Sequence, residues 1–361
     1  MYFSIKRLAS CFSGLLLIGV LISACGGSSA PTGTTTAGTP STGSTPTPVT
    51  LNVGQINDSI NFFPFYVAEQ MGYFKAQGIT LGERPRLQTG PKVVAALEAG
   101  SIDIGGAVIT DAFGMAKVDP SARVIGALTN GYVVDVVVSK KFAQDTHLTE
   151  ASPLADKINA LKGKKIGITG PNTGTEALLT YLFKLQGMDA HKDATLISLG
   201  SNNSAALTAL VQNRVDALSF FSPIGQAAEA QGAGNIFISP DNGDVPDLKG
   251  DVHGLFFTKQ STIDAKPQAI AGFIRAVSQA ESYIQANPDK AKELLNGYLK
   301  LGDSVSQAVY TATSPVWAKN PELSEATYQV ASQFHIKAGL ITAAPPYDTL
   351  VDSSEIAKAI A

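Results

Sequence analysis

Residues 96–104 read ALEAGSIDI, and residues 209–217 read ALVQNRVDA. In both segments a helical pattern ends, a tight turn follows and an apolar strand begins. The same helix–turn–strand device therefore occurs once in each half of the chain. This repetition predicts two similar α/β units that face each other.

Short apolar strands alternate with helical patterns on both sides of these segments, which is typical of a mostly parallel α/β sheet. The predicted strands cover residues 51–56, 102–107, 123–128, 133–139, 164–168, 194–199, 215–221 and 254–258. The predicted helices cover residues 64–77, 92–99, 176–186 and 205–212, and the chain is expected to be helical from residue 263 onward.

Length and composition restrict the class of protein. The chain has 361 residues, 44% hydrophobic and 16% charged, which suits a globular protein of two domains. The net charge is -3 and no run of Lys or Arg occurs, so a nucleic-acid binder is disfavoured. The two cysteines, Cys11 and Cys25, are both near the N-terminus, which leaves no disulfide or thiolate site for the folded body. We expect no metal and no cofactor, because the histidines lack the spacing of a helical zinc site: His147, His191, His253 and His335.

The first 25 residues have the pattern of a secretory signal, in which Lys6 and Arg7 precede an apolar stretch. Residues 22–25 read ISAC and resemble a bacterial lipobox, whose cysteine is lipidated after cleavage. Residues 26–50 are almost wholly Gly, Ser, Thr, Pro and Ala, which predicts a disordered tether. We therefore expect an exported protein anchored to the cell membrane by a lipid on Cys25. The alternative is a plain signal peptide with an incidental cysteine.

Four segments resemble one family of binding proteins. Residues 63–74 (FPFYVAEQMGYF) are similar to that family's first helix, and residues 96–104 to its turn before a strand. Residues 163–167 (GKKIG) and 173–175 (TGT) are similar to a strand and a helix start in its second lobe. The chain thus resembles the periplasmic-binding-like proteins of the nitrate, sulfonate and taurine transport group, the SsuA-like and NMT1-like proteins. That group includes binders of thiamine pyrimidine precursors.

The resemblance runs from about residue 51 to residue 301 and implies a two-lobed α/β fold, the type II periplasmic-binding-protein fold, with a ligand cleft between the lobes. By strand order, residues 51–135 and 258–361 would form lobe one, and residues 136–257 lobe two. The implied function is a monomeric substrate-binding lipoprotein of an ABC importer, which is not an enzyme and docks on permease and ATPase subunits. Two alternatives stay open: a ligand sensor that signals through a membrane partner, and a thiamine-pyrimidine biosynthetic enzyme of the same fold. The enzyme is disfavoured because no cysteine follows Cys25.

Polar residues that follow predicted strands are the candidate ligand contacts, because α/β folds bind ligands at the carboxyl ends of their strands. Asn57 and Asp58 follow the first strand, and Phe62 or Phe63 could stack on a flat ligand. The further candidates lie after other strands or at a helix start: Thr110, Asp111, Asn130, Thr173, Gly174, Thr175 and Ser222.

These candidates also have structural interpretations. The residues after the first strand could only shape a turn, one of the two phenylalanines could be core, and Thr110 and Asp111 could cap a helix. Thr173 and Glu176 fit the S/T-x-x-E capping box, although the same helix start offers free backbone amides to an anion. His253 is predicted to be structural or close to a hinge rather than a ligand contact.

The sequence leaves the solute open between an anion and a heterocycle. The helix start near Thr173 favours a sulfonate or nitrate, but no arginine lies in the candidate loops and Asp58 and Asp111 would repel an anion. Our hypothesis is a neutral or cationic-ended heterocycle such as a pyrimidine. It would stack on Phe62 or Phe63 and take polar contacts from Asn57, Asp58 or Asp111.

Overall fold

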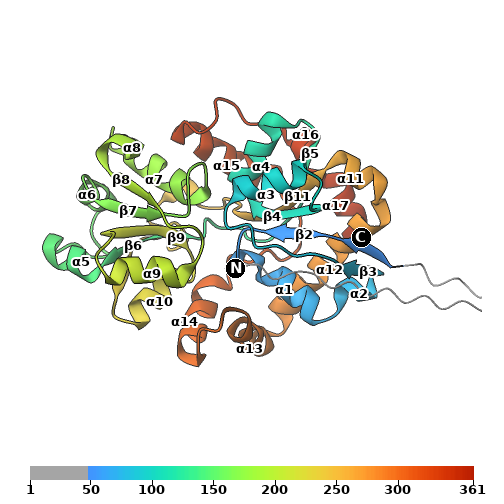
Figure 1. Cartoon of the computed structure of the whole chain (residues 1–361), viewed down its shortest axis with the longest axis horizontal. Coiled ribbons are helices and arrows are strands. Elements are labelled where there is room, and N and C mark those ends of the chain that lie inside the picture. Colours follow the sequence, from blue (N-terminus) through green and yellow to red (C-terminus); the bar gives the residue numbers. More distant parts are fainter. Residues whose placement is uncertain (1–47) are drawn as a thin grey trace, which may run out of the picture. The chain divides into compact units, whose positions relative to one another are not determined.

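Two sheets organise the computed structural model, which describes residues 48–361 (Figure 1). The first sheet has the strand order β2-β4-β11-β5, and the second sheet has the order β10-β6-β9-β7-β8. The predicted signal, Cys25 and nearly all of the tether lie outside the described residues, so the expectations about them stay predictions.

The first sheet is mixed. Strand β2 (Val53–Gln55) pairs in parallel with β4 (Ile104–Val108), and β11 (Gly254–Lys259) runs antiparallel between β4 and β5 (Ala122–Ala127). The chain therefore returns to the first sheet with β11. The predicted lobe boundary at residue 258 falls inside β11, whose pairing places the whole strand in the first sheet. We therefore place the boundary before β11. The division of the chain into two lobes stays our proposal, and it is supported by which strands belong to which sheet.

The second sheet is built around three parallel strands, β7 (Lys165–Ile168), β8 (Thr195–Ser198) and β9 (Ala217–Phe221). Strand β6 (Val134–Ser139) runs antiparallel between β9 and β10 (Gly234–Ile238). All six residues of β6 are buried, as expected for a strand whose two faces are both covered.

The repeated sequence device is a repeated structure. Gly100 and Asn213 hold the same place in the two turns, with left-handed φ angles of 68° and 51°. One residue before β4 and one residue before β9, each copy has an aspartate, Asp103 or Asp216, that bonds to the neighbouring strand. The Asp103 carboxylate accepts the backbone N–H just before β2 at 2.9 Å, and the Asp216 carboxylate accepts the first N–H of β7 at 2.8 Å. Each aspartate thus ties its strand to the parallel neighbour, which confirms the similarity read from the sequence.

Helices cover the first sheet on both faces: α3 and α4 lie on one side, and α1 and α12 on the other (Figure 1). The helices from the N-terminal part are α1 (Phe63–Gln70), α2 (Tyr73–Ala76), α3 (Gly90–Glu98) and α4 (Ile109–Val118). The C-terminal part is helical, as predicted: α11 (Gln260–Ala265), α12 (Pro267–Ala286), α13 (Pro288–Leu299), α14 (Asp303–Thr313), α15 (Glu325–Ala338), α16 (Tyr347–Leu350) and α17 (Ser353–Ile360).

The helices between β6 and β11 accompany the second sheet: α5 (Lys140–Thr146), α6 (Leu154–Ala160), α7 (Gly174–Leu185), α8 (Ala190–Asp193), α9 (Asn203–Val211) and α10 (Ile224–Ala230). Helix α15 contacts a helix of each half of the body. Its Phe334 ring lies 5.1 Å from the Tyr181 ring on α7, and its His335 ring lies 5.0 Å from the Phe113 ring on α4. Since α7 packs on β6 and β9, α15 joins the two halves of the body.

Two predicted elements are divided in the structure. The predicted strand over residues 51–56 is two strands, because β1 (Val49–Leu51) pairs with β3 (Ile79–Leu81) while β2 joins the first sheet. The predicted helix over residues 64–77 is α1 and α2, separated at Gly72, whose φ of 71° suits a glycine at the end of a helix.

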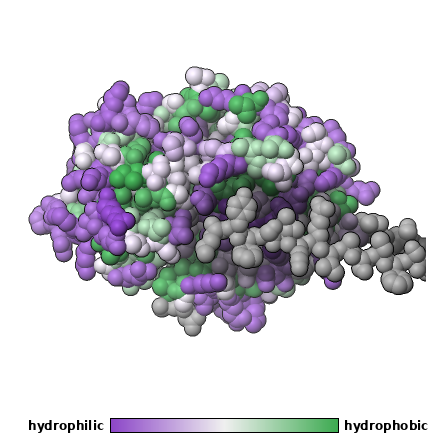
Figure 2. All heavy atoms as spheres, in the orientation of Figure 1, coloured by the Kyte–Doolittle hydropathy of each residue, from purple (hydrophilic) through white to green (hydrophobic). Residues whose placement is uncertain are grey.

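The surface shown in Figure 2 is mostly polar, with apolar residues in small separate patches. The large apolar side chains exposed in residues 48–361 lie on different elements: Val49, Met71, Val118, Leu185 and Val211. No helix in this range combines the length and the apolar character needed to cross a lipid bilayer. Nor do three or more His, Cys, Asp or Glu side chains of the described body come together as a metal site would require.

Candidate functional site

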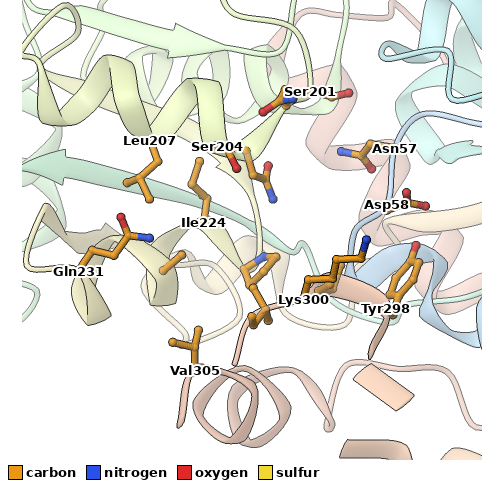
Figure 3. A pocket seen from close by; sticks show the side chains of 16 residues that line it. Asn57, Asp58, Ser201, Ser204, Leu207, Ile224, Gln231, Tyr298, Lys300 and Val305 are labelled. Atoms are coloured by element: carbon orange, nitrogen blue, oxygen red, sulfur yellow. The ribbon is translucent and has the colours of Figure 1, made fainter. Parts of the chain in front are cut away.

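A cavity of about 640 Å³ lies among elements that follow strands of both sheets (Figure 3). We call it the Asn57 cavity. On one side Asn57 and Asp58 follow β2, and on the other side residues 201–204 follow β8 and residues 223–224 follow β9. The end of α13 and the start of α14 complete the wall with Tyr298, Leu299, Lys300, Leu301 and Val305. This is the crevice at the carboxyl ends of strands where α/β folds bind ligands.

Asn57 is the most distinctive side chain of this cavity. Its backbone is held by Gln55 of β2, whose side-chain amide donates to the Asn57 carbonyl oxygen at 2.7 Å. The Asn57 side chain is 7% exposed, and neither its nitrogen nor its oxygen has a hydrogen-bond partner among the described residues. Leaving one such buried group unpaired costs on the order of 1–3 kcal/mol. A ligand that supplies an acceptor and a donor side by side would satisfy both atoms.

Asp58 lies beside Asn57 and has a partner that the sequence did not indicate. Its carboxylate forms an ion pair with Arg86 at 2.7 Å, and the two side chains are 47% and 35% exposed. Arg86 follows β3 in sequence and reaches Asp58 only through the fold. The pair offsets the negative charge at this edge of the cavity, although an exposed ion pair of this kind adds at most about 1 kcal/mol to stability.

Tyr298 supplies the aromatic ring of the cavity wall, at the end of α13. Its ring stacks on Tyr66 of α1 with 4.6 Å between centroids. Burial, followed by the nearby charge of Asp58, raises the pKa of the Tyr298 hydroxyl above its ordinary value. Figure 3 shows this side chain close to Asp58, on the same side of the cavity as Asn57.

The two phenylalanines predicted to stack on a ligand lie in the core instead. Phe63 is fully buried, with its ring 4.9 Å from the Trp317 ring, and Phe62 is 1% exposed. They lie where the short 3-10 turn over residues 60–62 meets α1, and that junction packs inward. Neither ring lines the Asn57 cavity, and the aromatic ring that does line it belongs to Tyr298.

The polar run SNNS at residues 201–204 lines the opposite wall and was missed from the sequence. Asn202 caps α9, because its side-chain oxygen accepts the Ala205 N–H at 2.9 Å. The side-chain oxygen of Asn203 is buried and has no hydrogen-bond partner within the described residues. The signal was present in the sequence: four small polar residues between a predicted strand and a predicted helix.

Ser222 and Asn130 lie outside the wall. The Ser222 hydroxyl donates to the buried Asp135 carboxylate at 3.1 Å, and its neighbours Pro223 and Ile224 line the cavity. Burial raises the pKa of Asp135 to about 6. Asn130 is exposed, and its backbone N–H donates to the Val316 carbonyl at 2.7 Å.

The start of α7 packs against the first sheet and does not line the Asn57 cavity. The hydroxyls of Thr173 and Thr175 bond to each other at 2.9 Å and to Thr169 at 3.1 and 2.9 Å. The carbonyl of Gly174 accepts the Tyr132 hydroxyl at 2.6 Å. These three predicted contacts therefore engage protein groups at the junction between the sheets.

The capping box predicted at this helix is wrong, because neither of its two hydrogen bonds forms. The Glu176 carboxylate accepts the backbone N–H of Asn172 at 2.6 Å, one residue before the expected donor. The Thr173 hydroxyl donates to the Gly170 carbonyl at 2.7 Å, and its side chain does not cap the helix. The tight turn before α7 thus takes the place of the usual cap.

His253 and the pair Thr110 and Asp111 lie elsewhere. His253 is fully buried and stacks on Tyr132 with 4.4 Å between ring centroids, as expected of a structural histidine at a crossing segment. Burial, with a smaller effect of His335, lowers its pKa to about 3, so its ring is neutral. Thr110 and Asp111 line a second cavity that shares no residue with the first.

Comparison with known proteins agrees with this geometry. Residues 44–296 match the NMT1-like family. The riboflavin-binding protein RibY of Chloroflexus aurantiacus is 28% identical over 321 residues, which cover 84% of this chain and 83% of RibY. The alkanesulfonate-binding protein SsuA from Xanthomonas axonopodis pv. citri superposes with a TM-score of 0.64 at 20% identity, covering 86% of this chain and 98% of SsuA. The nitrate-binding protein NrtA from Synechocystis PCC 6803 gives 0.65 at 15% identity, covering 86% and 88%. These likenesses establish the periplasmic-binding-protein fold that the sequence predicts.

Proposed function

The chain belongs to the NMT1-like family, and we propose that it is the solute-binding component of an ABC importer. The observation that carries the proposal is the Asn57 cavity. It lies at the strand ends of both sheets and holds a buried amide with both polar atoms unpaired among the described residues. A solute there would contact both halves of the body at once. That arrangement lets binding favour one relative position of the two halves.

The chemistry of the wall favours a neutral polar heterocycle as the solute. Of the described lining residues, most polar ones are amides and hydroxyls, and the charged ones are Asp58 and Lys300. Asp58 is already paired with Arg86. The Asn57 amide fits a ring edge that carries a donor next to an acceptor, and Tyr298 offers the ring to pack against it.

The two kinds of relative point to different solutes. The name of RibY supports a heterocycle, whereas the names of SsuA and NrtA support an anion. An anion would find Lys300 and the N-terminus of α9, which begins at Asn203, in the same wall. We favour the heterocycle because no arginine is among the described residues that line this cavity, and arginine is the residue that usually clamps an oxyanion.

Truncation of Asn57 tests the proposed site. Asn57→Ala should lower the affinity for the solute about tenfold or more, because it removes a donor and an acceptor at once. The matched control is Asn242→Ala, an exposed asparagine hydrogen-bonded to Glu150, which should bind like the wild type. Isothermal calorimetry gives both affinities. Equal affinity of Asn57→Ala and wild type would exclude this cavity as the solute site.

The export and anchoring of the protein rest on residues 1–47, and we propose lipidation at Cys25. Cys25→Ser should yield a folded protein that leaves the membrane fraction, since stable anchoring needs acyl chains. Membrane fractionation followed by a solute-binding assay measures both properties. A processed Cys25→Ser protein that stays in the membrane fraction would contradict the lipid anchor.

Two other roles would use the same cavity. A sensor would transmit solute binding to a membrane partner, and a thiamine-pyrimidine biosynthetic enzyme would convert its ligand. Uptake of radiolabelled solute by cells that lack this chain separates import from sensing, since an importer component is needed for uptake itself. Recovery of chemically unchanged solute from the complex distinguishes binding from catalysis.

A further inference from the structure

A second cavity of about 310 Å³ lies on α4, beside the start of α3 and the end of α15. We call it the Asp111 cavity. Much of its wall is apolar, with Val94 from α3 and Leu340 and Ile341 from the segment after α15. Asn172, from the turn before α7, completes the wall from the second half of the body. The space suits a compact apolar group of a few carbon atoms.

Asp111 gives this apolar cavity a buried carboxylate. The side chain is 3% exposed, and its Oδ2 accepts the Val108 N–H at 3.1 Å. Its Oδ1 has no hydrogen-bond partner in the described part of the chain. The carboxylate lies directly against Gly90, where a Cβ atom would be only 1.8 Å from Oδ1. Glycine at position 90 therefore makes room for the carboxylate in this place.

The Thr110 hydroxyl oxygen is a second acceptor in this cavity. This follows from which ring nitrogen of His335 carries the proton. The His335 Nδ1 lies 2.7 Å from the Ala331 carbonyl, which can only accept, so Nδ1 carries the proton. Burial lowers the pKa of His335 to about 4, so the ring is neutral and Nε2 is an acceptor. The Thr110 hydroxyl, 2.8 Å from Nε2, must therefore donate to it. Its oxygen then has only lone pairs left for a ligand.

We propose that the Asp111 cavity binds a small organic cation, a primary ammonium group on a compact apolar body. The ammonium would donate to Asp111 Oδ1 and Thr110 Oγ1, and the apolar body would pack against Val94 and Ile341. Asp111 Oδ1 and Thr110 Oγ1 both accept hydrogen bonds, so they favour a ligand group that only donates. An ammonium group has three N–H donors and no acceptor. Lys117 is an exposed residue of the same wall, where solvent screens its charge.

The charge state of Asp111 makes this binding dependent on pH. Burial raises the pKa of Asp111 to about 7 in the free protein, so the carboxyl is largely neutral at pH 6 and ionised at pH 8. The titratable groups near it are Lys117 on α4, His335 on α15 and Tyr132 before β6. His335 stays neutral, and Tyr132 keeps its proton over this range. The amine affinity should therefore rise between pH 6 and pH 8.

Calorimetry on the full chain with three probes of one shape tests the proposal. Cyclohexylamine should bind at pH 8, whereas cyclohexanol and cyclohexanecarboxylate should bind at least tenfold more weakly. Asp111→Asn keeps an acceptor for the Val108 N–H but removes the charge, and it should weaken amine binding at least tenfold. Gly114→Leu should also abolish binding, because a Cβ at position 114 meets no atom within 4 Å and the larger side chain can fill the cavity.

The matched control is Asn57→Ala, which should leave amine binding unchanged and thereby separate the two cavities. Melting curves establish that each variant is folded before its affinity is compared. Equal binding of the amine, the alcohol and the carboxylate would overturn the proposal. So would full amine affinity in folded Asp111→Asn or Gly114→Leu, or the absence of any amine binding at millimolar concentration.

Discussion

At the scale of single residues, Glu281 shows how strongly burial acts on one carboxyl group. It lies in α12 with no exposed surface, and neither of its oxygens has a hydrogen-bond partner among the described residues. Burial raises its pKa well above the ordinary value. The folded protein therefore holds this carboxyl in its neutral form, whereas the unfolded chain ionises it above about pH 4.3.

Replacement of Glu281 should change how stability depends on pH. Because the folded pKa is the higher one, the contribution of the neutral carboxyl is complete below about pH 4 and is lost as pH rises. Glu281→Gln keeps the shape without the titration, so its free energy of unfolding should exceed that of the wild type at pH 8 by roughly 1–3 kcal/mol. The advantage should shrink toward pH 4.

Urea unfolding at pH 4, 6 and 8 measures this difference. The matched control is Glu293→Gln on α13, whose side chain is 66% exposed and which should leave the pH profile nearly unchanged. If Glu281→Gln and wild type lose stability in parallel as pH rises, the buried carboxyl is not the cause.

Some candidate residues were predictable because their position follows from one strand. Asn57 and Asp58 come directly after β2, and the rule about strand ends suffices to place them in the cavity. Tyr298 was not predictable, since it reaches the wall through the packing of α13 against α1. The burial of Phe62 and Phe63 depends on the same long-range packing, which local sequence does not show.

At the scale of elements, Gly174, the first residue of α7, allows this helix to approach the first sheet closely. Gly174 lies where a Cβ atom would be 2.9 Å from the His253 Nε2 and 3.4 Å from the Val108 side chain. His253 is held in place by its stacking on Tyr132. Glycine thus allows the start of the helix to meet the first sheet.

A methyl group at this position should loosen the contact. Gly174→Ala should lower the free energy of unfolding by about 1–3 kcal/mol, the usual effect of overpacking. Gly114→Ala is the matched control: it lies within α4, its Cβ would meet no atom within 4 Å, and it should raise stability by up to about 1 kcal/mol. Chemical unfolding of both variants measures the two changes. A Gly174→Ala protein as stable as the wild type would contradict the close packing.

The elements themselves were largely predictable, because strands and helices of this chain carry their own periodicity. The ends of elements were harder where a turn competes with a helix. Residues 64–77 keep an apolar face across Gly72, so the pattern reads as one helix although the left-handed turn divides it. The predicted capping box of α7 was wrong for a similar reason, because the Thr173 hydroxyl bonds within the turn before the helix.

At the scale of the whole molecule, the repeat in residues 96–104 and 209–217 predicts two similar units, and the two segments share a left-handed turn and an aspartate bond to the neighbouring strand. The wall of the Asn57 cavity depends on a third contribution that the repeat does not contain. Helices α13 and α14 come from the C-terminal region and close the side between the two sheets. The size of the cavity could therefore not be read from the repeat alone.

We propose that the Asn57 cavity holds a neutral polar heterocycle, and calorimetry against two solute classes is the sharpest test. Aminopyrimidines and riboflavin represent the heterocycles, and taurine, alkanesulfonates and nitrate represent the anions. A heterocycle should bind the wild type with one site per chain and should bind Asn57→Ala about tenfold or more weakly. Tight binding of a sulfonate or nitrate with no response to any heterocycle would contradict it.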